Sequence, residues 1–600
     1  MAKGFDKENK GKKSYNEGGY NNKDKKFGKD KKFGKDSSGI KFVKGGDKRR
    51  TTVDDNTKSM RRLYNKLMQK SKDSKKEVNK VEIVNKLLKM VNNNYAEVCF
   101  KHDGCRVLQG SIKYGDKKQR YEIIKQLIPH VYDLIIKKYS IYLALKLYKY
   151  AEAKQKEEII TLSVYPNFGK LMKNANGKEF LNFVFDNSGH STQNNLVDYY
   201  MNKYLKISEE KLKQIKSENE NLPKKESENT VNTENPTDPA NDVIIHERQG
   251  TFAGESTRDD LKAHLEIQLE KEVHKNHIFQ AFLNRAFDYL DAKTKVYLAE
   301  LFDDDLNEFL HHRPGVELAC KVFTVASAKT RKKVIKKLKD TLKTFTSNET
   351  SVLFLIKIIL FNDDTKLVEK YILKSLMELC NEELMQNKIL FKILCNIISP
   401  FNPRVNNSSE NKVLSYKEDT GSKKDEAKRH EELINVTLDD IFRIVNPNVK
   451  FFTSDQTYST LLIEMINLLI KKNETQKLKE ILRNISSTVQ IDYQNNFDDV
   501  EATLLADKTS HFVINRIMKT LKEKEDVLED FYKSLSDILL NNLDGYLNTK
   551  AIFLIITIVE NPKTKKFLEP ALNKFKSMIK TKSGEKDMIG FQLLNKILNN

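Results

Sequence analysis

Basic side chains are the residues of this sequence best suited to chemistry, and that chemistry is the binding of phosphate. Ammonium and guanidinium groups donate hydrogen bonds to phosphate oxygens and release counterions when they do so. The chain has 105 Lys and Arg against 84 Asp and Glu, a formal net charge of +21. We therefore expect a polyanionic partner, with nucleic acid ahead of an acidic membrane. The candidates for phosphate contact are Lys101, His102, Arg106, Lys113, Lys137, Lys138, Lys146, Lys170, Lys173 and Lys178, with Arg331, Lys332, Lys333, Lys336 and Lys337 as a second patch.

Sequence patterns for catalysis or metal binding are absent. The chain has no GxxxxGK[ST] and no HExxH motif, and its five cysteines include no CxxC pair. The histidines lack metal-ligand spacing, and Asp303, Asp304 and Asp305 resemble a helix cap or an interaction patch. We predict that the protein is not an enzyme and needs no cofactor and no metal.

Signals for membrane insertion or secretion are also missing from the sequence. It has no run of about eighteen or more apolar residues, and its N-terminal stretch is rich in Lys and Gly. We expect no membrane partner and no secretory signal. The cysteines are typical of reduced thiols in a cytosolic or nuclear protein.

The elements that must position the basic residues are helical repeats. Cys99 to Gly115, CFKHDGCRVLQGSIKYG, is the best copy; related copies follow at Lys137 to Ala151 and Asn174 to Phe185. From Cys105 to Ile141 is 36 positions, and Lys178 comes 37 positions later. Such a period fits stacked helical hairpins, none of which can bury its apolar face alone. Strand-period alternation is not evident, so we predict an all-α solenoid.

Composition divides the chain further. Asp24 to Lys35 iterates DKKFGK within a basic stretch that has too little apolar surface to fold, and Ser208 to Asn241 loses helical periodicity and gains Pro, Asn and Glu. The predicted organisation is a disordered basic tail (1–58), N-terminal repeats (59–207), a disordered insertion or linker (208–256), further repeats (257–400), a polar insertion (401–430) and C-terminal helical repeats (431–600).

Several strings carry a family resemblance. KHDGCRVLQ, HHRPGVELACKVF, AKTRKKVIKKLK, FNDDTKLVEKYI, ISPFNP with SKKDEAKRHEEL, and ADKTSHFVINRIM resemble the Pumilio-type (Puf) repeat family, and more narrowly its nucleolar Puf-A/Penguin branch with a characteristic C-terminal domain. The resemblance implies a curved superhelix of about eleven armadillo-like repeats, a nuclear and nucleolar location, and a role in rRNA processing for the large ribosomal subunit. It also implies binding to RNA or DNA with little sequence preference.

In sequence-reading repeats of this kind, each second helix presents two side chains that read a base edge and one that stacks on the base. Cys105, Arg106 and Gln109 match that pattern. The next copy offers Ile141, Tyr142 and Leu145, of which only Tyr142 could contact a base, and the third offers Lys178, Glu179 and Asn182. One good reader among poor ones cannot specify a sequence, so we expect binding dominated by the phosphate backbone.

The sequence thus favours a monomeric scaffold that grips structured RNA, expected to be pre-rRNA, while other faces hold pre-ribosomal assembly proteins; mRNA and DNA are further ligand classes. Two alternatives stay open. One is a protein-binding armadillo or HEAT-type scaffold, whose repeat lengths lie close to this one. The other is a sequence-specific Puf regulator of mRNA translation, which would need more repeats of the quality of Cys105, Arg106 and Gln109.

Overall fold

The computed structural model describes residues 55–69, 79–206, 210, 213, 265, 267, 273–302, 306–418, 422–521, 524–585 and 587–599. The chain divides into two units, Met1–Lys58 and Ser59–Asn600. All regular elements within the described residues are helices, which confirms the all-α prediction. Residues 1–54, almost all of the predicted linker at 208–256, and Asp303 to Asp305 lie outside the described residues.

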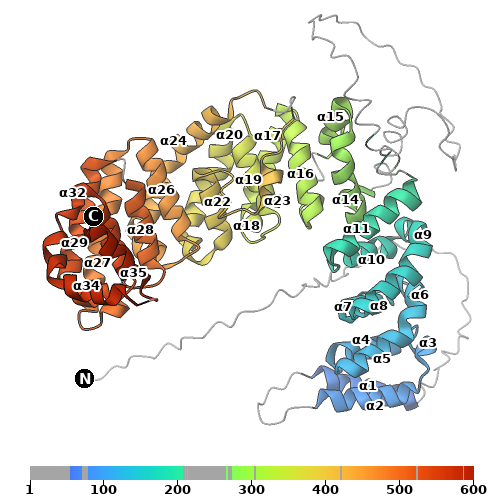
Figure 1. Ribbon diagram of the computed structural model, residues 1–600. Coiled ribbons are helices and arrows are strands. Elements are labelled where there is room, and N and C mark those ends of the chain that lie inside the picture. Colours follow the sequence, from blue (N-terminus) through green and yellow to red (C-terminus); the bar gives the residue numbers. More distant parts are fainter. Residues whose placement is uncertain are drawn as a thin grey trace, which may run out of the picture. The chain divides into compact units, whose positions relative to one another are not determined.

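In the second unit, one helix of each repeat packs against the corresponding helix of the next, so that these helices form a continuous row (Figure 1). This stacking is what defines a solenoid. The row consists of α4 (His102–Tyr114), α7 (Ile141–Tyr150), α10 (Ala175–Asp186), α14 (His277–Ala286), α16 (Arg313–Val325), α19 (Val352–Phe361), α22 (Lys388–Ile398), α26 (Ser459–Lys471), α28 (Ser510–Thr520), α31 (Ile552–Glu560) and α35 (Ile589–Asn599).

The remaining helices precede, connect or flank members of the row. They are α1 (Asp55–Met68), α2 (Lys80–Val91), α3 (Tyr95–Val98), α5 (Lys117–Leu127), α6 (Val131–Ile136), α8 (Ala153–Ile159), α9 (Phe168–Lys173), α11 (His190–Tyr199), α15 (Ala292–Leu301), α17 (Ala328–Leu338), α18 (Leu342–Phe345), α20 (Thr365–Val368), α21 (Lys374–Glu383), α23 (Ser408–Leu414), α24 (Glu426–Val445), α25 (Val449–Ser454), α27 (Thr475–Asn495), α29 (Glu525–Leu540), α30 (Leu543–Leu547), α32 (Pro562–Lys565), α33 (Glu569–Leu572) and α34 (Lys576–Ser583). Short 3₁₀ and π turns extend several of them, such as Phe287–Tyr289 after α14.

Glycine recurs near the start of three row helices because the preceding turn passes very close there. A Cβ atom on Gly104, Gly177 or Gly315 would lie 2.3, 2.3 or 2.2 Å from the main-chain oxygen of Val98, Leu171 or Phe309, respectively. No real Cβ tolerates such a distance. The predicted equivalence of Gly104 and Gly315 therefore has a steric origin.

Polar caps fix where the row helices begin. The side chains of Asn174, Asn276 and Asn387 accept hydrogen bonds from main-chain N–H groups in the first turns of α10, α14 and α22. His312 does the same for α16, because its Nδ1 accepts from the N–H of Gly315 at 3.3 Å. Burial lowers the pKa of His312 to about 2, with smaller contributions from neighbouring histidines, so this cap stays neutral.

The repeats on either side of the predicted linker share one hydrophobic core. α14 packs against both α10 and α11, and the rings of Tyr200 and Phe282 lie 5.5 Å apart. Arg285 Nη1 also donates to Asp198 Oδ1 at 2.6 Å. The row therefore continues directly from α10 to α14.

Residues 402–418, within the segment expected as a polar insertion, are packed onto the middle of the row; we call them the strap. Asn406 and Asn396 of α22 exchange side-chain hydrogen bonds of 2.7 and 3.1 Å. Lys357 of α19, only 1% exposed, donates from Nζ to the main-chain oxygens of Leu414 at 3.0 Å and Tyr416 at 2.5 Å. The polar residues of this segment thus satisfy polar groups of the row.

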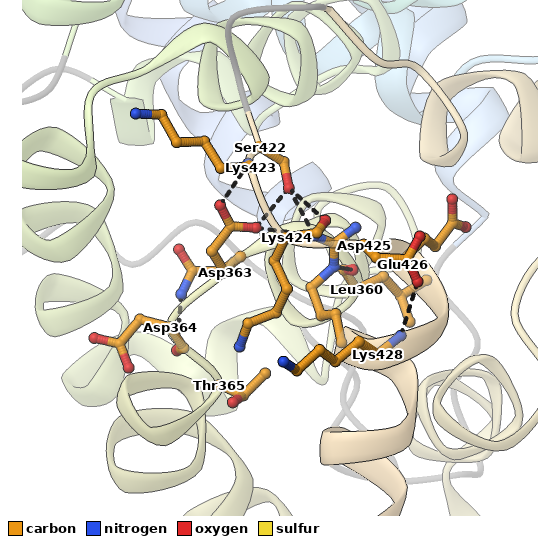
Figure 2. Close-up of polar contacts among 12 residues, drawn as sticks. Leu360, Asp363, Asp364, Thr365, Ser422, Lys423, Lys424, Asp425, Glu426 and Lys428 are labelled. Atoms are coloured by element: carbon orange, nitrogen blue, oxygen red, sulfur yellow. Dashed lines mark hydrogen bonds and ion pairs between the residues drawn. The ribbon is translucent and has the colours of Figure 1, made fainter.

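A second set of contacts holds the residues that follow the strap (Figure 2). Asp363, after α19, accepts hydrogen bonds from Ser422 Oγ at 2.5 Å and from the N–H of Lys423 at 2.9 Å. Arg429 of α24 donates to Asp363 Oδ1 at 2.9 Å and, through Nε, to the oxygen of Leu360 at 2.7 Å. Burial alone would raise the pKa of Asp363, but these hydrogen bonds and nearby guanidinium groups outweigh it and lower that pKa. Hydrogen bonds thus hold the residues on both sides of 419–421 against the row.

The Gly177→Ala substitution tests the steric requirement of the repeat. We expect it to destabilise the protein by about 1–3 kcal/mol, because the new Cβ meets main-chain atoms of Leu171 that can move only if the helices separate. Urea unfolding followed by circular dichroism measures this. Gly189→Ser is the control, since its Cβ enters open space and its hydroxyl can cap α11; we expect a change of less than about 0.5 kcal/mol. A wild-type midpoint for Gly177→Ala would contradict the steric argument.

The buried Lys357 predicts a pH dependence. Burial lowers the pKa of its ammonium group from 10.5 to about 8, so between these values the unfolded chain binds the proton more tightly than the folded chain. The free energy of unfolding should rise with pH in this window, by at most about 1.4 kcal/mol per pH unit. Lys357→Met should lack this rise. Urea titrations from about pH 7.5 to 10 compare the two proteins, and parallel curves would contradict the assignment.

Candidate nucleic-acid interface

The best predicted base-reading set is only partly available to a ligand. Cys105 is buried in α4, and Gln109 Nε2 donates to its Sγ at 3.4 Å. Burial also raises the pKa of the Cys105 thiol, which argues against a reactive thiolate. Of the three residues, Arg106 alone is exposed. α4 can therefore offer a guanidinium group, while its two predicted edge readers are turned to each other.

Two exposed tyrosines accompany the basic residues at the start of α7. Tyr142, the predicted stacking residue of the second copy, is 57% exposed, whereas Ile141 beside it is buried. Tyr139 is 65% exposed; its ring packs edge-on against His102 at 6.1 Å, and Lys138 Nζ lies 5.9 Å from its centroid. The sequence interpretation did not include Tyr139. Its signal is the Lys-Lys-Tyr string just before the apolar pattern of the helix.

Lys113 of α4 and Lys146 of α7 repel each other. Burial lowers the pKa of the half-buried Lys146, and the charge of Lys113 lowers it further. The described part of the chain gives neither lysine an acidic partner. A bound anion between them would relieve both the repulsion and the loss of hydration, which favours phosphate contact at this position.

The third copy, in α10, is already engaged by the next repeat. Asn182 Oδ1 accepts from Asn276 Nδ2 at 3.0 Å and from the N–H of His277 at 2.9 Å, and its Nδ2 donates to the oxygen of Lys275 at 3.2 Å. Lys178 is half-buried and in contact with other groups. Most of the hydrogen-bonding groups of Asn182 are therefore already used and are not available to read a base.

Most of the predicted N-terminal cations have no ion pair within the described residues. Lys101 pairs with Glu97, and His102 Nδ1 lies 3.6 Å from Asp103 Oδ1. Lys137 and Lys170 lie over the rings of Phe100 and Tyr132 at 3.6 and 5.9 Å. We define the N-terminal cationic surface as the residues for which the described chain supplies no carboxylate: Arg106, Lys113, Lys137, Lys138, Lys146, Lys170 and Lys173.

The second predicted patch lies on α17, a helix outside the row. Lys332, Lys333, Lys336 and Lys337 are exposed there. Arg331 is a correction to the prediction: it is only 8% exposed, its Nε donates to the oxygen of Ala326 at 3.0 Å, and its guanidinium lies 5.7 Å from the centroid of the Phe361 ring. The exposed cations of this patch are therefore the four lysines of α17.

Two further properties of the described residues concern metals and membranes. Among these residues, His, Cys, Asp and Glu side chains form no group of three or more that could hold a metal ion. In that same part of the chain, no helix combines the length and apolar character needed to cross a bilayer.

Comparison with known sequences places these features in a family context. Residues 386–530 match the family model described as the CPL (NUC119) domain. The chain is 22% identical over 493 residues to human Pumilio homolog 3, covering 80% of this chain and 70% of that protein. It is also 22% identical over 540 residues to Pumilio homology domain family member 6 of Saccharomyces cerevisiae, covering 86% of this chain and 77% of that protein.

Comparison with solved structures supports the same fold. The crystal structure of human Puf-A covers 91% of this chain and 100% of its own, with a TM-score of 0.64 and 18% identity. A structure of human Puf-A in complex with DNA matches with the same TM-score and identity. The stacked row, the CPL match and the Pumilio-homology relatives agree with the resemblance drawn from the sequence motifs. The chain contains a CPL (NUC119) domain match and is similar over most of its length to Pumilio-homology proteins, and its fold is similar to that of human Puf-A.

Proposed function

We propose that this protein is an RNA-binding scaffold that holds structured RNA mainly by its phosphate backbone, through the N-terminal cationic surface. The observation that carries the proposal is the group of basic side chains on and around α4, α7 and α9 for which the described chain supplies no carboxylate. Cations without a carboxylate partner, such as Lys113 and Lys146, which repel each other, are stable only when hydrated or bound to anions. A polyanion binds several at once and gains entropy from released counterions.

Low sequence preference follows because the residues predicted to read base edges are already hydrogen-bonded within the protein. Gln109 is hydrogen-bonded to Cys105, and Asn182 is bonded to the next repeat. Direct readout needs free donors and acceptors that face the base edge. These engagements disfavour a sequence-specific regulator of mRNA translation. Exposed Tyr139 and Tyr142 provide faces on which any unpaired base can stack.

The relatives support a nucleic-acid ligand. Pumilio homolog 3 and Pumilio homology domain family member 6 share most of this chain's length, and human Puf-A has been crystallised with DNA. From the family resemblance we propose further that the RNA is pre-rRNA, that the protein acts in large ribosomal subunit biogenesis in the nucleolus, and that it is a monomer whose other faces hold assembly proteins. Binding rather than catalysis is its proposed activity.

The double substitution Arg106→Ala with Lys138→Ala tests the surface. It should weaken RNA binding by a similar factor on unrelated sequences, because phosphate contacts carry no sequence information. Two lost contacts should also lower the slope of log affinity against log salt by about 1.4 for single strands. Fluorescence titrations at several salt concentrations measure both quantities.

Lys574→Ala with Lys576→Ala is the matched control, since both lysines are exposed near α34 and the net charge changes equally. We expect this control to bind almost as the wild type does. Equal losses in the two variants would mean that net charge alone drives binding. Unchanged affinity in the Arg106 and Lys138 variant would place the RNA elsewhere.

A further inference from the structure

The strap supplies carboxylates to basic residues in the middle of the row. Glu410 Oε1 accepts from Lys392 Nζ of α22 at 2.7 Å and lies 3.7 Å from Arg313 Nη1 of α16. Glu418 Oε1 accepts from Lys295 Nζ of α15 at 2.7 Å. Two lysines of the central repeats are therefore neutralised by two glutamates of one segment. Arg313 donates from Nε to Glu317 of its own helix at 2.8 Å, and Glu410 only adds a second, longer contact.

One of these cations is the repeat counterpart of Arg106. At the start of α4, the N–H of Cys105 donates to the main-chain oxygen of Lys101. At the start of α22, the N–H of Phe391 donates to that of Asn387. Arg106 and Lys392, which come next, therefore occupy equivalent positions. Arg106 in α4 is exposed and has no ion pair within the described residues. Lys392 in α22 is half-buried under the strap and paired with Glu410.

A second repeat position shows the same contrast. Lys146 stands five residues after Ile141 in α7, as Lys357 does after Val352 in α19 and Lys321 does after Val316 in α16. Lys146 faces Lys113 and meets no carboxylate within the described residues.

The two central lysines at this position are covered by the strap or bound to acidic groups. Lys357 donates to main-chain oxygens of Leu414 and Tyr416. Lys321 bonds to Asp288 at 2.8 Å, and its Nζ lies 5.5 Å from the centroid of the Tyr416 ring. The strap thus supplies oxygens to Lys357 and an aromatic ring near Lys321, whereas no segment of the described chain covers Lys146 at the equivalent position.

We propose that the strap is an internal occupant of the polyanion-binding face of the row, and that it confines nucleic acid to α4, α7 and α9. Its carboxylates and main-chain oxygens take the place that phosphate oxygens take on the N-terminal repeats. This inference rests on the proposed function and adds to it the extent of the bound segment. The buried bonds of Asn406 and Lys357 make the strap a fixed part of the fold rather than a readily displaced loop.

The test is Glu410→Gln with Glu418→Gln. Glutamine keeps the size of each side chain, and at position 410 it can keep the reciprocal cap with Asn407, but it no longer neutralises Lys392 and Lys295. Arg313 keeps its ion pair with Glu317. If the two lysines become available to phosphates, the slope of log affinity against log salt should steepen by about 1.4 for single strands. Affinity should also go on rising with oligonucleotide length beyond the length at which the wild type levels off. Titrations with poly(U) oligonucleotides of increasing length measure both effects.

Glu382→Gln with Glu383→Gln is the control, because both residues are exposed on α21 outside the row and the change in net charge is the same. It should leave the slope and the length dependence as in the wild type. A folded strap variant that behaves like this control would overturn the proposal. Circular dichroism and thermal unfolding report whether the variant is folded.

Photo-crosslinking of the wild-type protein to the same RNA decides the matter even if the strap variant does not fold. Crosslinked peptides should come from α4, α7 and α9, and crosslinks within α16, α19 or α22 would refute confinement. Absence of any RNA binding by the wild type would instead refute the proposed function, and the role of the strap with it. Normal binding with a variant that matches the control refutes only the strap proposal.

Discussion

Neutralisation of basic side chains along the row is the constraint on which the rest of this molecule depends. A half-buried ammonium group loses hydration and must find oxygens from the chain or from a ligand. In the middle of the row the chain provides them, as Glu410 does for Lys392. On α4 and α7 the described chain provides none for Lys113 and Lys146; burial lowers the pKa of Lys146, and the charge of Lys113 lowers it further. The same kind of surface is therefore filled in one part of the solenoid and open in another.

The stacking of repeats makes such comparisons meaningful. Several row helices begin at a polar side-chain cap, and α4, α10 and α16 each follow a turn that passes close to their first residues, so side chains at equivalent positions have similar surroundings. The glycine at 104, 177 and 315 permits that close approach. Because a repeat contacts mainly its neighbours, one segment such as the strap can alter the surface of a few repeats without changing the others.

Local patterns in the sequence were enough for the fold and for part of the site. The 36-residue spacing of Cys105 and Ile141 corresponds to the packing of α4 on α7, and Arg106 lies exposed as a phosphate contact requires. Arg331 was wrongly predicted to contact phosphate, because the prediction relied on the basic composition of its helix and ignored which side of the helix Arg331 lies on. It stands three, four and seven residues before the buried Val334, Ile335 and Leu338, so helical spacing alone would have placed it on the buried side.

The strap could not be inferred from composition. Residues 401–430 are polar, and polar stretches of this kind usually form solvated loops. Here the partners are distant in sequence: Glu418 pairs with Lys295, and Lys357 bonds to Leu414. Likewise, the engagement of Asn182 depends on a helix that begins beyond the linker. Pairings of this kind depend on which repeats stack together, and a single sequence does not contain that information.

Hydrogen–deuterium exchange of the full-length protein with and without saturating RNA tests the central claim most directly. The account predicts that RNA slows exchange in α4, α7, α9 and the segment before α7, while α16, α19, α22 and the strap exchange at the same rate in both states. Protection concentrated on the central repeats, or on α17 alone, would contradict it.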